Sequence, residues 1–238
     1  SKIVVWDSAT STAQGLISLG SEAGDGVRML SFSHNSQYLL ALSNNKKNTL
    51  TIYDVATRKP VFVVNHGDHE IITSIKFCGT AAMFCCVGTT GITMYIDEGR
   101  GFLPSLSYRD YKSRPGVSST ENGASGIGTA VCNFEYEDET VTATSDGYVL
   151  FWHGRNCIQS LKVHTGAITS LHYDENAKKV VAGTDDGFVF AFQLGSGASK
   201  STSVAKAGPR KVSVRQLEQC LNFDIGHIGS ASRKITSL

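Results

Sequence analysis

The stretch Val141-Thr142-Ala143-Thr144-Ser145-Asp146-Gly147, followed by the run from Tyr148 to Trp152, contains two strand patterns around one tight turn. Small and β-branched residues precede the turn and large apolar residues follow it, which is typical of strands in a sheet. Asp-Gly between two such runs predicts a β-hairpin with a type I′ turn, in which both central residues have positive φ. Residues 141–152 therefore predict two antiparallel neighbours of one sheet.

The same unit recurs along the chain, which indicates a repeat architecture. The run from Val180 to Phe192 has the same order of small residues, Asp-Gly turn and aromatic ending. An opening strand of nearly constant sequence, Ile-Thr-Ser-Ile or Ile-Thr-Ser-Leu, occurs at 72–75, 168–171 and 235–238. The large residues that end strands are separated by 47, 43, 56 and 40 residues; they are Trp6, Tyr53, Ile96, Trp152 and Phe192. Three of these intervals fit the roughly 40–45 residues of a propeller blade, and an insertion at 109–126 explains the long one.

These residues resemble WD repeats. Val5-Trp6-Asp7, Ile52-Tyr53-Asp54 and Phe151-Trp152 occupy the place of the repeat's Trp-Asp, and Gly226-His227 matches its Gly-His element. More narrowly, the segment from Ile3 to Asp54 is similar to the first propeller of the echinoderm-microtubule-associated-protein-like family. The resemblance implies that His66 and His164 hydrogen-bond within a blade to a Ser or Thr and to the turn Asp. The structural repeat positions that it implies are Trp6, Asp7, Tyr53, Asp54, Asp146, Trp152, His164, Asp186, Phe192 and His227.

The predicted fold is all-β, a WD40-type β-propeller that is an incomplete arc of about five four-stranded antiparallel blades. We expect a partial blade at 1–20, blades at 21–68, 69–111, 127–165 and 166–226, an insertion loop at 112–126, and the start of another blade at 227–238. Because a seven-bladed propeller needs roughly 300 residues, this single incomplete propeller cannot close alone. The remaining blades are expected outside this chain, in the same polypeptide or in a partner.

Composition argues against several classes of partner. The formal net charge is +1 and the pI about 7.6, so no global field attracts nucleic acid or a membrane surface. No apolar run reaches the roughly 20 residues of a membrane-spanning helix. The six cysteines show no zinc spacing, and we expect them to be buried free thiols in a reducing compartment. The vicinal pair Cys85-Cys86 alternates across a strand and is expected to pack in the core.

No catalytic residues, cofactor or metal are predicted. Lys200-Ser201-Thr202 lacks the glycine and the helix of a phosphate loop. His66, Asp68, His69 and Glu70 could form a metal site, but a structural role for the histidines is favoured over it. We therefore expect a non-catalytic scaffold whose loops contact other proteins.

Two basic segments are candidate partner-binding surfaces. The segment 195–211 carries four cations and no acid, and the insertion loop 112–126 carries two more; these residues are Lys200, Lys206, Arg210, Lys211, Lys112 and Arg114. A basic loop can meet an acidic microtubule surface through salt-sensitive attraction. Together with the family resemblance, this predicts a cytoplasmic, cytoskeletal protein bound to tubulin or microtubules, in settings that include cilia and the axoneme.

The alternative prediction is a general assembly hub or a ubiquitin-ligase substrate receptor. Val141 to Asp146, followed by Val149, Phe151, Trp152 and Arg155, resembles the box by which some WD proteins dock on a cullin adaptor. His153 stands where that box has an acid, and Thr140 where it has an apolar residue.

Overall fold

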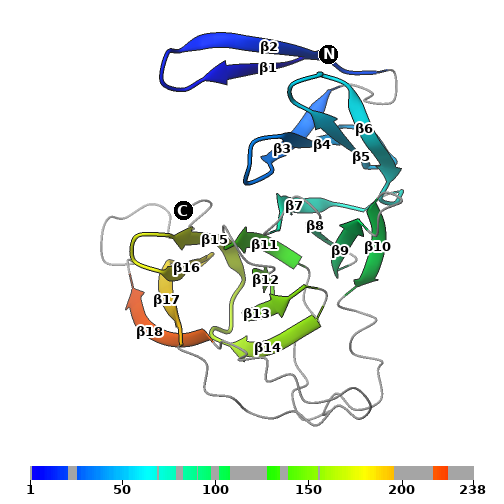
Figure 1. Cartoon of the computed structure of the whole chain (residues 1–238). Helices are drawn as coiled ribbons and strands as arrows, with labels where there is room; N and C mark the ends of the chain where they lie inside the picture. Colours follow the sequence, from blue (N-terminus) through cyan, green and yellow to red (C-terminus); the bar gives the residue numbers. More distant parts are fainter. Residues whose placement is uncertain are drawn as a thin grey trace, which may run out of the picture. The chain divides into compact units, whose positions relative to one another are not determined.

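The structure is a computed structural model. It describes residues 2–20, 26–68, 70–78, 83–89, 91–97, 102–107, 128–134, 139–154, 156–195 and 217–224. These residues form strands, turns and loops and contain no helix, so the all-β prediction is confirmed (Figure 1). It follows that the described part of the chain holds no helix able to cross a membrane.

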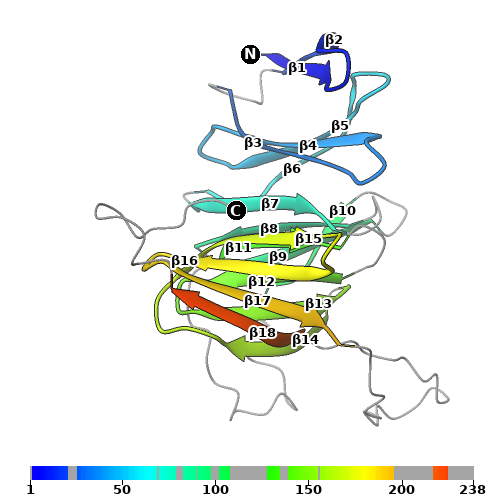
Figure 2. The same cartoon turned by 90° about the vertical axis from the view of Figure 1, so that its left-hand side faces the viewer.

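The strands form one two-stranded and four four-stranded sheets, each with its strands in chain order. The two-stranded ribbon pairs β1 (Lys2–Asp7) with β2 (Thr12–Ser18). The next sheets contain β3 (Val27–Phe32), β4 (Tyr38–Ser43), β5 (Thr49–Asp54) and β6 (Pro60–Asn65), then β7 (Ile72–Phe77), β8 (Met83–Gly88), β9 (Gly91–Asp97) and β10 (Phe102–Ser107). The last two contain β11 (Gly128–Asn133), β12 (Glu139–Thr144), β13 (Tyr148–His153) and β14 (Asn156–Lys162), then β15 (Ile168–Asp174), β16 (Lys179–Thr184), β17 (Phe188–Leu194) and β18 (Leu217–Asp224). Figure 2 shows β16, β17 and β18 as neighbouring strands.

The chain divides into two compact units, which we describe separately. The first comprises Ser1–Val117 with Asn133–Glu139, and the second comprises Ser118–Cys132 with Thr140–Leu238.

The first unit has two apolar cores, one on each face of the β3–β6 sheet. One face packs on the β1–β2 ribbon through Ile3, Ile17, Leu39, Ala41 and Tyr53. The other packs on the β7–β10 sheet through a cluster that includes Leu40, Leu42, Ile72, Phe84 and Tyr95. Odd and even positions of β4 therefore point into different cores, as the period of two in a strand requires.

Trp6 differs from the other strand-end anchors because 62% of its surface is exposed. Ile3 of β1 points into the core, and the alternation places Val4 and Trp6 on the opposite, exposed face. Leu16 of β2 pairs with Val4 and is also exposed. The described residues of the first unit pack on the opposite face of the ribbon, through Ile3 and Ile17.

The second unit is held by large side chains from the strand ends. Trp152 and Phe192 are 1% and 0% exposed, and every residue of β12 is buried. The indole Nε1 of Trp152 donates a hydrogen bond of 2.8 Å to Thr142 Oγ1. In the next sheet Phe192 has no such donor, and Ala182 stands on β16 where β12 has Thr142.

The Asp-Gly hairpins are not type I′ turns, so that prediction was wrong. Gly147 and Gly187 have φ of +78° and +93°, whereas Asp146 and Asp186 are not among the residues with positive φ. The Gly147 amide donates to the Thr144 carbonyl at 3.1 Å, and the loop has three residues with glycine at the third position. The Thr144 hydroxyl accepts a hydrogen bond from the Tyr148 amide, which closes this wider turn.

The cysteine prediction was right for five residues and wrong for one. Cys78, Cys85, Cys86, Cys132 and Cys157 are buried free thiols, but Cys220 on β18 is exposed. Burial raises the pKa of Cys85 and of Cys86. Neither thiol of the vicinal pair therefore has thiolate character at neutral pH.

Candidate functional site

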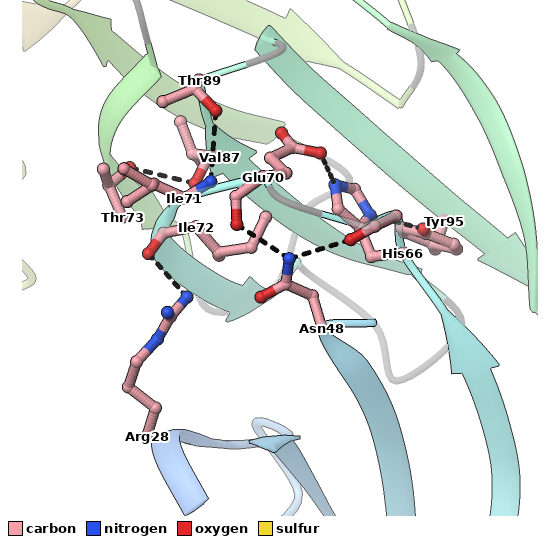
Figure 3. Close-up of polar contacts among 11 residues, drawn as sticks. Arg28, Asn48, His66, Glu70, Ile71, Ile72, Thr73, Val87, Thr89 and Tyr95 are labelled. Carbon is pink, nitrogen blue, oxygen red and sulfur yellow. Dashed lines mark hydrogen bonds and ion pairs between the residues drawn. The ribbon is translucent and has the colours of Figure 1, made fainter. Parts of the chain in front are cut away.

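The loop between β6 and β7 is fixed against the turn between β4 and β5 (Figure 3). The His66 and Gly67 amides donate to the carbonyls of Asn48 and Lys47, both at 3.3 Å. Asn48 has φ of +49°, and its Nδ2 donates to the carbonyls of Gly67 at 2.9 Å and Glu70 at 2.8 Å. The Asn48 side chain thus fixes this loop by two hydrogen bonds. Asparagine also tolerates the left-handed backbone conformation at this position better than most residues do.

The His66 imidazole lies between a carboxylate and a phenol. Its Nε2 is 3.0 Å from Glu70 Oε2, and its Nδ1 is 2.6 Å from the Tyr95 hydroxyl (Figure 3). The His66 and Glu70 side chains are only 5% and 6% exposed. Burial raises the pKa of Tyr95, with Cys86 and Glu70 adding to the effect. A phenol–imidazole–carboxylate chain can move a proton, but both ring nitrogens are occupied and no position is left for a reacting group.

The expected partners of His66 were wrong. Its partners are Glu70 and Tyr95 rather than a Ser or Thr and a turn Asp, because the turn after β8 reads Gly88-Thr89-Thr90-Gly91 and has no Asp. His69 lies outside the described residues. Within those that are described, no cluster of three His, Cys, Asp or Glu side chains is arranged to hold a metal ion.

The loop between β14 and β15 has the network that the repeat resemblance implied. His164 Nε2 lies 2.6 Å from Asp186 Oδ2, and the Thr184 hydroxyl donates to Asp186 Oδ1 at 2.6 Å. Burial pushes the pKa of Asp186 up, but hydrogen bonds from Thr184 and His164 outweigh it and hold the pKa below its usual value. The carboxylate is therefore ionised at neutral pH and fixes the imidazole on the turn of its own sheet.

The same loop also contacts the preceding sheet. The amides of Val163 and His164 both donate to the Gly147 carbonyl, at 3.0 and 3.3 Å. A Cβ at position 147 would lie 2.1 Å from the His164 carbonyl oxygen. The loop can approach this closely only because residue 147 is glycine.

Asp7 and Asp54 serve hairpin turns. Asp7 Oδ1 accepts hydrogen bonds from the Ala9 and Thr10 amides, and Asp54 Oδ1 accepts one from the Thr57 amide. These backbone donors hold the pKa of both carboxyls below its usual value. Asp146, in the turn between β12 and β13, instead accepts from the Thr144 hydroxyl at 2.6 Å, as Asp186 accepts from Thr184.

The remaining predicted residues lie outside the described part of the chain. These are His227 and the six basic residues Lys112, Arg114, Lys200, Lys206, Arg210 and Lys211. Sequence reasoning missed the roles of Asn48 and Tyr95. Asn48 could have been found, because it occupies the turn position that Gly147 fills in a later repeat.

Consecutive four-stranded antiparallel sheets, a buried Trp–Thr hydrogen bond and a His–Asp–Thr network at the strand ends define a WD40-type β-propeller fold. The comparisons agree with this class. Residues 155–192 match the family model described as WD domain, G-beta repeat.

The chain is 23% identical over 213 residues to the guanine nucleotide-binding protein subunit beta of Saccharomyces cerevisiae, a match that covers 84% of the chain and 45% of that protein. The chain thus spans about half the length of this curated relative. Among solved structures, the β-propeller domain of Myceliophteria thermophila Cps50 (Swd1) matches with a TM-score of 0.64 and 16% identity, over 94% of this chain and 65% of that one. U3-55K matches with a TM-score of 0.58 and 16% identity, over 80% of this chain and 54% of that one. At these identities the solved structures establish the fold alone.

Proposed function

We propose that this protein is a non-catalytic platform that binds other proteins through the loops at the ends of its sheets. The proposal rests on one observation: the polar side chains of the candidate site are already hydrogen-bonded within the protein. The His66 ring is bonded to Glu70 and Tyr95, and the His164 ring to Asp186, while the backbone amides of both histidines are bonded to a turn of the preceding sheet. Such groups give rigidity rather than chemistry.

Rigid loops favour binding because less conformational entropy is lost when a partner is bound. Asn48 is buried and fixed, while its neighbours Lys46 and Lys47 are exposed on the same turn. The relative in yeast is named as a subunit of a guanine nucleotide-binding protein, which is consistent with assembly into complexes. The fold by itself does not specify the partner.

Tubulin is the finer hypothesis for that partner, together with a cytoplasmic, cytoskeletal location. It is supported by the resemblance to the echinoderm-microtubule-associated-protein-like family and by the basic residues of 195–211. Co-sedimentation of the full-length protein with microtubules at low and high salt tests it, and absence from the pellet at low salt would refute it.

For the alternative, a ubiquitin-ligase receptor, the structure adds one constraint. Trp152 of the docking box is buried and hydrogen-bonded, so replacing it tests folding rather than adaptor binding. Arg155 lies outside the described residues.

The general proposal is tested in two steps. The tagged full-length protein is first purified from its own cells, and the co-purified protein whose amount is nearest to equimolar is identified. The complex of the two is then re-formed from purified components. We expect a complex by sedimentation velocity that is weakened by Lys46→Glu with Lys47→Glu if the partner uses that end of the sheets. Failure of every co-purified protein to re-form a complex would overturn the proposal.

A further inference from the structure

A cleft of about 330 Å³ lies in the first unit between the β1–β2 ribbon and two loops of the next sheet. The loops are those between β3 and β4 and between β5 and β6, so the cleft is at the opposite strand ends from the Asn48 turn. Its lining includes Gln14, Gly15, Ser36, Val55 and Arg58, together with Val5 of β1.

The Arg58 backbone belongs to the hairpin turn, and one hydrogen bond positions its guanidinium in the cleft. Its amide donates to the Asp54 carbonyl at 2.8 Å, and its Nη2 donates to the Gln14 carbonyl at 3.0 Å. The guanidinium lies against Gly15, where an added Cβ would be 2.9 Å from Nε and 3.4 Å from Cζ. The guanidinium can lie here because residue 15 is a glycine and has no side chain.

The turn does not require arginine at this position. Arg58 has φ of +61°, a backbone region that disfavours every residue with a Cβ. Ser11 occupies the same place in the β1–β2 turn, with φ of +54° and the same amide-to-carbonyl hydrogen bond to Asp7. The turn itself therefore places no specific demand for arginine at residue 58.

The nearby acids do not neutralise Arg58. Asp7 accepts hydrogen bonds from two amides and from Gln14 Nε2, and Asp54 accepts one from the Thr57 amide. No ion pair to Arg58 is found among the described residues. Among the described residues that line the cleft, Arg58 is the single charged one.

We propose that this cleft binds the carboxylate of an Asp or Glu side chain in an extended segment of a partner protein, an inference that rests on the proposed function. A guanidinium offers a planar fork of donors that matches a carboxylate. The Ser36 hydroxyl lines the same cleft as a further donor, and Val5 and Val55 supply apolar contact for the methylenes of the acid. One positive charge balances a carboxylate, whereas a phosphate of nearly two negative charges would remain unbalanced.

The test uses the full chain labelled with ¹⁵N and three capped pentapeptides that differ in one residue. Their central residue is Glu, Gln or phosphoserine, flanked by Gly-Val and Val-Gly. Titration with the Glu peptide is expected to shift the Arg58 Nε–Hε and Gly15 amide signals saturably, and the Gln peptide to bind roughly tenfold more weakly. Equal binding of Glu and Gln peptides, or tighter binding of the phosphoserine peptide, would overturn the assignment.

Variants connect the binding to the cleft. Arg58→Gln is expected to lower affinity for the Glu peptide by about tenfold, and Gly15→Ala to lower it by displacing the guanidinium. Lys59→Gln, which removes an exposed neighbouring charge, is the matched control and should leave affinity unchanged. Arg58→Gly should raise the thermal midpoint while binding is lost, because glycine relieves the positive φ.

Unchanged affinity in Arg58→Gln, or an equal loss in Lys59→Gln, would refute the site. Peptide binding is measured without the natural partner, so its failure leaves the complex described under the proposed function intact. Conversely, if that complex does not form, the peptide titration still tests whether the cleft binds a carboxylate.

Discussion

Replacing Thr142 by valine removes one hydroxyl from a buried pair and keeps the shape of the side chain. The hydroxyl accepts the Trp152 indole N–H at 2.8 Å, and both residues are at most 1% exposed. In the valine variant the indole N–H loses this acceptor, and water cannot reach the buried site to replace it. A buried donor left unsatisfied costs about 1–3 kcal/mol, so we expect the free energy of unfolding to fall by that amount.

The hydrogen bond is separated from packing by a double-mutant cycle measured by urea unfolding, with far-ultraviolet circular dichroism as the probe. Trp152→Phe removes the donor, as Phe192 does naturally in the next sheet. In that background Thr142→Val should cost close to nothing, which gives a coupling energy of about 1–3 kcal/mol. An equal cost of Thr142→Val with Trp and with Phe at position 152 would refute the reasoning.

Thr140 provides the matched control on the same strand. Its hydroxyl is also buried but has no hydrogen-bond partner among the described residues. Thr140→Val is therefore expected to be neutral or stabilising, since an unpaired buried hydroxyl disappears. A cost equal to that of Thr142→Val would show that both changes act through packing.

Three further predictions concern other residues. Gly147→Ala should lower the free energy of unfolding by about 2–4 kcal/mol, because the new Cβ clashes with the His164 carbonyl and φ is positive. Gly154→Ala is the control, since the space around residue 154 is open, and it should cost about 1 kcal/mol. Equal urea midpoints for the two variants would contradict this prediction. Burial raises the pKa of Tyr95 above its usual 10.0, so the neutral phenol stabilises the fold below pH 10 and this contribution is lost as pH rises further; Tyr95→Phe should flatten the fall of the urea midpoint between pH 9 and 11. A thiol reagent should modify Cys220 rapidly in the native protein and the five buried thiols only on unfolding, and Cys220→Ser should remove the fast phase.

The sheets could be predicted because their pattern is local. Residues 141–144 and 148–152 alternate or run apolar over the length of one strand, and the repeat of Ile-Thr-Ser marks β7 and β15. The His164–Asp186 contact followed from the family resemblance.

Other features depend on contacts that no local pattern contains. The type I′ prediction failed because the Thr144 hydroxyl takes the Tyr148 amide and widens the turn. His66 finds Tyr95 across 29 residues, and Arg58 reaches Gln14 across 44. No sequence pattern near Arg58 indicates that Gly15 leaves room for its guanidinium.

The two loops that carry His66 and His164 each contact two neighbouring sheets. The backbone of His66 and of His164 reaches back to the turn of the sheet before it, and the ring reaches forward into the sheet that follows. A tandem duplication of one period, roughly 40 residues, would copy a backward and a forward half-junction together. The new repeat would therefore carry both the contact to the sheet before it and the contact to the sheet after it.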